Sequence, residues 1–143
     1  MNLKNIGFMD YKVIEIEGVG PAYAAKLKAA GFESASDLLG AGLTEAGRII
    51  ISQNTGIPEP LINRWVNHAD LFRVDGIGPQ FAEILCASGI NSVEDLAKCD
   101  ATELEARLRA TDEKMHLTRR VPSVKELEKM INLAAQVEPV LSY

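Results

Sequence analysis

The sequence predicts an all-α protein, and three observations support this fold class. No segment alternates apolar and polar residues with the period of two that marks a half-buried strand. Aromatic residues make up only 6% of the chain, while Ala, Leu and Ile are frequent, which favours helices over sheets. The chain also repeats a helical pattern: residues 16–39, IEGVGPAYAAKLKAAGFESASDLL, and residues 74–97, VDGIGPQFAEILCASGINSVEDLA, share Gly-x-Gly-Pro and then Gly-x-x-Ser-x-x-Asp-Leu.

The two copies of this pattern lie 58 residues apart, the distance from Gly18 to Gly76. Such a spacing is too long for a solenoid repeat and suits two small units fused in one chain. We therefore expect an N-terminal extension at residues 1–8, a first unit at residues 9–73 and a second unit at residues 74–143, packed as a compact helical domain.

Local start and stop signals predict the helices of the first unit. Pro21 suits the first position of a helix, where its missing N–H needs no partner, and Gly31 suits the left-handed position that ends it. Ser34, with Asp37 three residues later, and Thr44 are favourable N-caps, and Pro60 opens the last helix. The expected elements are a short helix or extended piece at residues 11–16 and helices at residues 21–30, 35–39, 45–54 and 60–73.

The second unit begins with the same signals. Pro79 opens a helix that Gly89 ends, and Ser92, with Asp95, starts a short helix. Thr102 corresponds to Thr44, so we expect it to cap a helix over about residues 103–114.

The second unit then diverges from the first. Residues 112–122 have the composition of a longer connection. Ser123 and Glu126 have the spacing of a capping box, which predicts a final helix to about Gln136.

Composition excludes several classes of protein. With 143 residues, of which 47% are hydrophobic, the chain can bury a core and is not disordered throughout. No apolar run reaches the length of a membrane span, and the N-terminus lacks the pattern of a signal peptide. We expect a soluble cytoplasmic protein without a membrane partner.

The net charge of −5 argues against a strongly cationic nucleic-acid binder. Neither half of the chain has a positive net charge, so any contact with nucleic acid must be local.

The glycine turns and their helices carry a resemblance to known proteins. An apolar residue, a Gly-apolar-Gly turn and a helix with alanine at its fourth position resemble the helix-hairpin-helix motif. The tandem of 58-residue units resembles an uncharacterised bacterial domain family with two such units, over about residues 9–138, and residues 55–79 and 119–130 are its most specific stretches. The residues that carry the resemblance are Gly18, Gly20, Pro21, Ala24, Leu27, Gly31 and Asp37, with Gly76, Gly78, Pro79, Ala82, Leu85, Gly89 and Asp95.

The helix-hairpin-helix resemblance implies sequence-nonspecific DNA binding. Tight glycine turns direct backbone N–H groups and the positive end of a helix at a phosphate oxygen. Such contacts carry no sequence information. The amides that the resemblance assigns to this role belong to Gly18, Val19 and Gly20 in the first turn and to Gly76, Ile77 and Gly78 in the second.

The charges around the two turns differ. Lys26 and Lys28 follow the first turn, whereas Asp75 and Glu83 flank the second, where they would repel a phosphate. For the first turn, phosphate binding and a purely structural role stay equally open. For the second turn, the structural role is the favoured interpretation.

Basic residues concentrate in the C-terminal part of the second unit, where glutamates dilute them. A solvated surface is the ordinary explanation of such a stretch. Arg119 and Arg120, just ahead of a helix start, are the best candidates there for a contact with an anion or an acidic partner.

Residues 47–66 also resemble a helix-turn-helix, although two helices packed through apolar faces explain the pattern better. We expect Trp65 to be a core residue. His68 and His116 are isolated and are expected to be surface or capping residues. The side chains that a recognition helix would present are Asn63, Arg64 and Asn67.

No set of residues predicts catalysis. Cleavage of a phosphodiester with two metals needs clustered carboxylates, and here the acidic residues are scattered, with Asp37 and Asp95 explained as helix caps. Cys86 and Cys99 have neither a CxxC spacing nor nearby histidines, which predicts free thiols. We therefore expect no enzyme activity, no cofactor and no metal.

Two hypotheses for function remain. The first is a non-catalytic module that binds DNA without sequence specificity, through the hairpin amides and the nearby lysines. The alternative is a protein-interaction or scaffold module in which both hairpins are purely structural. The sequence does not predict the oligomeric state.

Overall fold

The computed structural model describes residues 10–143, so the expected extension at residues 1–8 lies outside the described residues. Over this range the chain is helical and has no strand; its extended pairing is an isolated bridge between Lys12 and Ser34. The elements are a 3-10 helix η2 (Val13–Glu15) and the helices α1 (Gly20–Ala29), α2 (Ala35–Ala41), α3 (Glu45–Thr55), α4 (Glu59–Leu71), α5 (Pro79–Ala87), α6 (Val93–Ala97), α7 (Ala101–Met115) and α8 (Val124–Ala135). The all-α prediction is confirmed.

Most of the predicted helix starts are confirmed. The Ser34 hydroxyl accepts a hydrogen bond from the Asp37 amide at 3.1 Å, and the Ser34 amide donates to the Asp37 carboxylate at 3.2 Å, which completes the capping box of α2. Thr44 and Ser92 cap α3 and α6 in the same way, by accepting from an amide three residues later. Gly31, with a φ of 96°, follows the end of α1 as predicted.

The prediction that Thr102 caps α7 is wrong. The Asp100 carboxylate accepts the hydrogen bond of the Glu103 amide at 3.0 Å, and α7 begins at Ala101, so Thr102 already lies inside the helix. A carboxylate at the positive end of a helix gains both the hydrogen bond and the interaction with the helix dipole, which explains why Asp100 is preferred.

The connection between α7 and α8 is shorter than predicted. Helix α7 continues to Met115 and ends at His116, whose φ of 53° places it in the left-handed region. His116 is therefore a capping residue, one of the two roles expected for it. Ser123 caps α8 by accepting from the Glu126 amide at 3.2 Å, but the Glu126 side chain binds Arg120 instead of completing the box.

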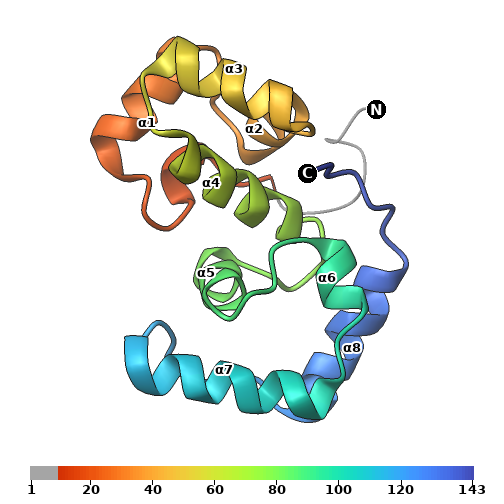
Figure 1. The fold of residues 1–143 in the computed structure, drawn as a ribbon. Helices are drawn as coiled ribbons and strands as arrows, with labels where there is room; N and C mark the ends of the chain where they lie inside the picture. Colours follow the sequence, from red (N-terminus) through yellow and green to blue (C-terminus); the bar gives the residue numbers. More distant parts are fainter. Residues whose placement is uncertain (1–9) are drawn as a thin grey trace.

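In each half of the chain the last helix packs against the two helices before it (Figure 1). Helix α4 packs against α2 and α3, and α8 packs against α6 and α7. Helix α4 also contacts α5 and so joins the halves, whose buried side chains form one hydrophobic cluster within residues 10–143. The side chains of α4 and α8 that face this core are spaced alike, 65 residues apart: Ile62 and Leu127, Trp65 and Met130, Ala69 and Ala134.

The C-terminal residues 137–143 lie back along the first half of the chain (Figure 1). Two buried arginines hold them there. The Arg48 guanidinium donates to the Ser142 carbonyl at 2.8 Å, and the Arg73 guanidinium donates to the Glu138 carbonyl at 2.6 Å. Because these bonds join residues far apart in sequence, they fix the path of the C-terminal segment.

A buried ion pair strengthens the junction of the two halves. The Asp70 carboxylate accepts from Arg73 at 2.8 Å and from the Val93 amide, at the start of α6, at 2.9 Å. Removing either charged partner would leave the other buried without compensation, which is costly.

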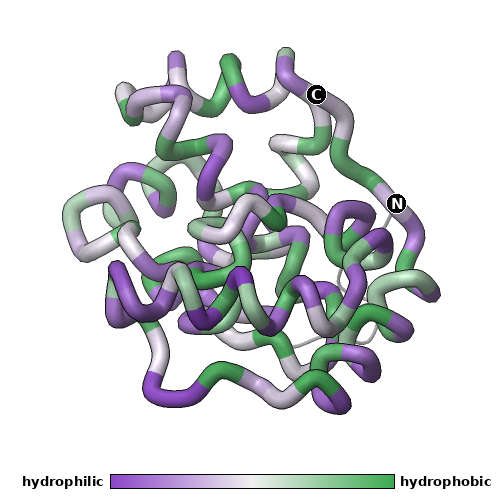
Figure 2. Tube along the Cα trace, turned by 60° about the horizontal axis from the view of Figure 1, so that its bottom comes forward, coloured by the Kyte–Doolittle hydropathy of each residue, from purple (hydrophilic) through white to green (hydrophobic). Residues whose placement is uncertain are grey.

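Hydrophobic and hydrophilic residues are interspersed along each helix (Figure 2), as expected for helices that bury one face and expose the other. No helix in residues 10–143 is long and apolar enough to cross a membrane.

Candidate functional site

In the first glycine turn, residues 17–20, both glycine amides are free of hydrogen bonds within the described residues. Gly18 and Gly20 have φ values of 91° and 69°, which only glycine adopts readily, and both are exposed. Within residues 10–143 neither amide donates a hydrogen bond. The Val19 amide donates to the Ile16 carbonyl at 3.2 Å, and Val19 is buried, so this amide serves the turn itself. Of the three amides named from the sequence, two are open to an incoming acceptor.

Trp65 supports this turn from the core side. Its side chain is fully buried, as predicted, and its ring packs against Tyr23 with 5.4 Å between centroids. A Cβ on Gly18 would lie 3.7 Å from the Trp65 indole nitrogen, so the turn packs directly against the indole.

Lys26 and Lys28 lie at the opposite end of α1 from the turn. Both are exposed in the last turn of the helix, roughly 9 and 12 Å from Gly20 along the axis at 1.5 Å per residue. Lys28 lies 3.9 Å from Glu33, and both side chains of this pair are mostly exposed. Two residues apart, the lysines also point to different sides of the helix. The turn and the lysines are therefore spread along and around α1 and do not form a single cluster.

The second glycine turn, residues 75–78, is more enclosed. Gly76 has a φ of 94°, but Gly78 has a φ of −96° and is half-buried. A Cβ on Gly78 would lie 3.4 Å from the Tyr11 hydroxyl. The buried Ile77 donates its amide to the Val74 carbonyl at 3.1 Å, and again neither glycine amide has a partner among the described residues.

Arg120 lies beside the second turn, although the two are over 40 residues apart in sequence. Gly76, Gly78, Met130 and Arg120 line one shallow hollow of about 550 Å³. The Arg120 guanidinium donates to both carboxylate oxygens of Glu126, at 3.1 and 3.0 Å, and this lowers the pKa of Glu126. The charge of Arg120 is therefore paired. Arg119 is exposed and does not line the hollow.

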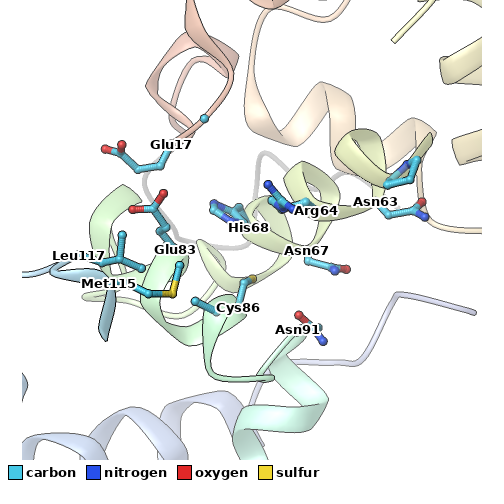
Figure 3. Close-up of a pocket in the computed structure, with 13 residues that line it drawn as sticks. Glu17, Asn63, Arg64, Asn67, His68, Glu83, Cys86, Asn91, Met115 and Leu117 are labelled. Atoms are coloured by element: carbon cyan, nitrogen blue, oxygen red, sulfur yellow. The ribbon is translucent and has the colours of Figure 1, made fainter. Parts of the chain in front are cut away.

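A deeper cleft of about 510 Å³ lies between the first turn, α4, α5 and the end of α7 (Figure 3). The three residues that the helix-turn-helix pattern singled out on α4 line this cleft, so they face another part of the same chain. These residues are Asn63, Arg64 and Asn67.

The expectation that His68 lies at the surface or caps a helix is wrong. It is 1% exposed, because α4 is covered by helices on several sides, and its Nδ1 has no hydrogen-bond partner in the described part of the chain. Burial, and to a lesser extent the positive charge of Arg64, lowers its pKa to about 4. His68 is therefore neutral near pH 7.

Two carboxylates lie at the side of the cleft next to the first turn. Burial, and then the negative charge of Glu17, raises the pKa of Glu83, which Arg64 opposes. Glu17 lies near Glu83, and Arg64 and His68 lie side by side on α4 (Figure 3). The Arg64 guanidinium makes no hydrogen bond or ion pair with any residue in 10–143.

Cys86 also lines the cleft, and burial raises the pKa of its thiol to about 12. A thiol that stays protonated is a poor nucleophile. Cys86 and Cys99 are both free, as predicted. In the described range no group of three or more His, Cys, Asp or Glu residues is arranged to hold a metal ion.

One comparison with known proteins gives a match. The sequence model of the family described as "Domain of unknown function (DUF4332)" matches residues 17–137, which include both glycine turns and the cleft. No curated protein and no solved structure matches the chain.

Proposed function

We propose that this chain, which belongs to the family of the domain of unknown function DUF4332, is a non-catalytic module that binds DNA without sequence specificity. The observation that carries the proposal is the pair of exposed, unbonded amides of Gly18 and Gly20 at the N-terminus of α1. Backbone amides at the positive end of a helix are suited to a phosphate oxygen.

The architecture behind this proposal is a tandem pair of helix-hairpin-helix units. The packing of α4 on α2 and α3, and of α8 on α6 and α7, supports it. So does the position of Trp65 beside Gly18 and of Met130 beside Gly76, at equivalent places on α4 and α8. Each unit would present one glycine turn.

Lys26 and Lys28 extend the proposed contact along α1. Phosphates recur along a DNA strand, so lysines roughly 10 Å from the turn would bind different phosphates from the one at the amides. Glu17, next to Gly18, opposes the approach of a phosphate and makes the proposed binding weak.

The second turn contributes less in this proposal. Its amides lie in a hollow beside a guanidinium that Glu126 already pairs, and Asp75 adds a negative charge. Arg119 is exposed and makes no ion pair within residues 10–143, so it stays a candidate for a phosphate contact.

Fluorescence anisotropy tests the proposal with labelled duplexes of two unrelated sequences over a range of salt concentrations. Backbone binding predicts equal affinity for both duplexes and a fall of about 0.9 log units in affinity per log unit of salt for each phosphate neutralised. Absence of binding even at low salt would contradict the proposal and favour the protein-interaction alternative.

The double variant Lys26→Glu/Lys28→Glu identifies the binding face. We expect it to abolish measurable binding, because two phosphate contacts become repulsive. Lys125→Glu/Lys129→Glu on α8 is the matched control: both lysines are exposed, the change in net charge is the same, and binding should weaken far less. Equal losses in the two variants would mean that the overall charge, and not α1, governs binding.

A further inference from the structure

The cleft beside α4 has features of a ligand site, and the proposed binding to the DNA backbone does not use them. Its volume of about 510 Å³ lies in the range of small-molecule pockets. Its walls come from the first turn, α4, α5, the loop between α5 and α6 and the end of α7, so the cleft exists only in the folded chain (Figure 3).

Polar atoms buried in the cleft lack partners. Nδ1 of His68 and Oδ1 of Asn63 are both inaccessible to solvent and make no hydrogen bond within residues 10–143. His68 as a whole is 1% exposed. Buried polar groups usually have a partner, so the walls at His68 and Asn63 keep unused hydrogen-bonding capacity. Because both atoms are closed to solvent, the groups that a ligand can reach are the other polar side chains that line the cleft.

The charges of the cleft disfavour an anionic ligand. Glu17 and Glu83 contribute two carboxylates against the one guanidinium of Arg64, and His68 is neutral near pH 7. The carboxylates suit N–H donors. A neutral ligand with an amino group meets this requirement, and a phosphate does not.

The remaining residues of the cleft suit a flat ring with a polar edge. Met115, Leu117 and Ala87 offer apolar surface to the face of a ring, and methionine sulfur packs well against aromatic rings. Asn91 offers an amide with a donor beside an acceptor, the pairing that matches the amino-and-nitrogen edge of adenine or cytosine. The Asn67 carbonyl oxygen accepts from the Tyr143 hydroxyl, so Asn67 offers mainly its NH2 group as a donor.

We propose that the cleft between α4 and α5 binds a neutral nucleobase that carries an exocyclic amino group, adenine or cytosine. In this site Glu83 accepts from the amino group, the asparagine amides bind the ring edge, and Met115 packs on the ring face. The base belongs either to a free nucleoside or to an unpaired position of a nucleic-acid strand.

Saturation-transfer NMR and titration calorimetry on the full chain test the site with adenosine, cytidine, uridine and adenosine monophosphate. We expect adenosine and cytidine to bind, and uridine and the monophosphate to bind at least about tenfold more weakly. Uridine or the monophosphate binding as tightly as adenosine would overturn the assigned chemistry.

Two variants locate the ligand. Ala87 is exposed, so Ala87→Trp fills the cleft without disturbing the core and should abolish adenosine binding, whereas Ala106→Trp on the exposed face of α7 should not. Glu83→Gln should weaken adenosine binding about tenfold, and Glu128→Gln on α8 should leave it unchanged. Circular dichroism checks that all four fold. Adenosine binding that survives both Ala87→Trp and Glu83→Gln would overturn the proposal.

Binding to single-stranded oligonucleotides of dA and of dT shows whether the base belongs to a free nucleoside or to a nucleic-acid strand. If the base belongs to a strand, dA binds more tightly than dT, and Ala87→Trp removes this preference. If the ligand is a free nucleoside, Lys26→Glu/Lys28→Glu loses DNA binding but keeps adenosine binding, so failure of the proposed function leaves this site testable. Lack of both adenosine binding and a preference for dA would overturn the proposal.

Discussion

At the first turn Gly20 has a φ of 69°, and a Cβ there would meet nothing within 4 Å; at the second turn the corresponding Gly78 has a φ of −96°, and a Cβ would lie 3.4 Å from Tyr11. The two turns share Gly-x-Gly-Pro. Their difference arises from what packs around them: the first is open above Trp65, whereas Tyr11, Met130 and the Arg120–Glu126 pair surround the second.

This contrast shows how little a turn motif says about its own accessibility. In each turn the middle amide is used internally and neither glycine amide has a partner in residues 10–143, so the motif produces the same local hydrogen bonding twice. Which amides an outside phosphate can reach depends on residues far away in the sequence.

Trp65→Ala should have the largest effect, because the indole is fully buried beneath the first turn. We expect it to lower the free energy of unfolding by about 3–5 kcal/mol. Met130→Ala, at the equivalent place below the second turn, should lower it by about 1 kcal/mol, since Met130 is only partly buried. Urea unfolding followed by circular dichroism measures both. Equal losses would show that both turns depend on the core to the same extent.

The free energy of unfolding should depend on pH through His68, a buried histidine on α4. Helix α8, the counterpart of α4 in the second half, has no histidine. The pKa of His68 is about 4 in the folded chain and about 6.5 in the unfolded chain, so between these values the unfolded chain binds more protons. The free energy of unfolding should therefore fall as pH drops from 6.5 to 4, by about 3 kcal/mol in total, and this contribution is complete above pH 6.5.

Urea unfolding at several pH values, with His68→Gln as the comparison, isolates this contribution. The variant should be less sensitive to pH between 4 and 6.5. A parallel pH dependence in the two proteins would show that His68 is not buried in its neutral form.

Gly20→Ala and Gly78→Ala compare the backbones of the two turns directly. We expect Gly20→Ala to cost about 1 kcal/mol, because its φ of 69° is unfavourable for alanine. Gly78→Ala should change stability by less than about 0.5 kcal/mol, because a φ of −96° suits any residue and the Tyr11 contact is ordinary. Thermal unfolding resolves the two. A larger loss for Gly78→Ala would reverse the assignment of open and enclosed turns.

Glu17→Gln and Asp75→Asn should have the smallest effects. If the first turn binds phosphate, removing the charge of Glu17 should raise DNA affinity a few-fold, by less than about 1 kcal/mol. Asp75→Asn should change the affinity less, because the second turn contributes less to the proposed contact. Anisotropy at low salt, where charge effects are largest, distinguishes them. Equal gains for the two variants would indicate that both turns contact DNA.

Much of the fold was predictable from the sequence because helix starts and ends are local. Ser34, Ser92 and Thr44 cap the helices predicted from them, and Gly31 ends α1. The error at Thr102 arose because Asp100, two positions earlier, can also cap α7. The correspondence of Thr102 with Thr44 did not show which of the two residues does so.

The candidate site was predictable only in part. The sequence identified the glycine turns, but their distance from Lys26 and Lys28 and the pairing of Arg120 with Glu126 depend on geometry. Nothing local indicated that His68 is buried. The cleft had one signal, the polar residues of the helix-turn-helix pattern on α4, but its walls come from residues 17 to 117, which only folding brings together.

The helices, most of their caps and the two glycine turns follow from the sequence alone, because hydrogen bonds between residues three or four positions apart form them. Which turn is open, which arginine is paired and where the cleft lies depend on the folded chain. Exposure and charge pairing result from contacts such as Gly78 with Tyr11 and Gly18 with Trp65, which join distant residues.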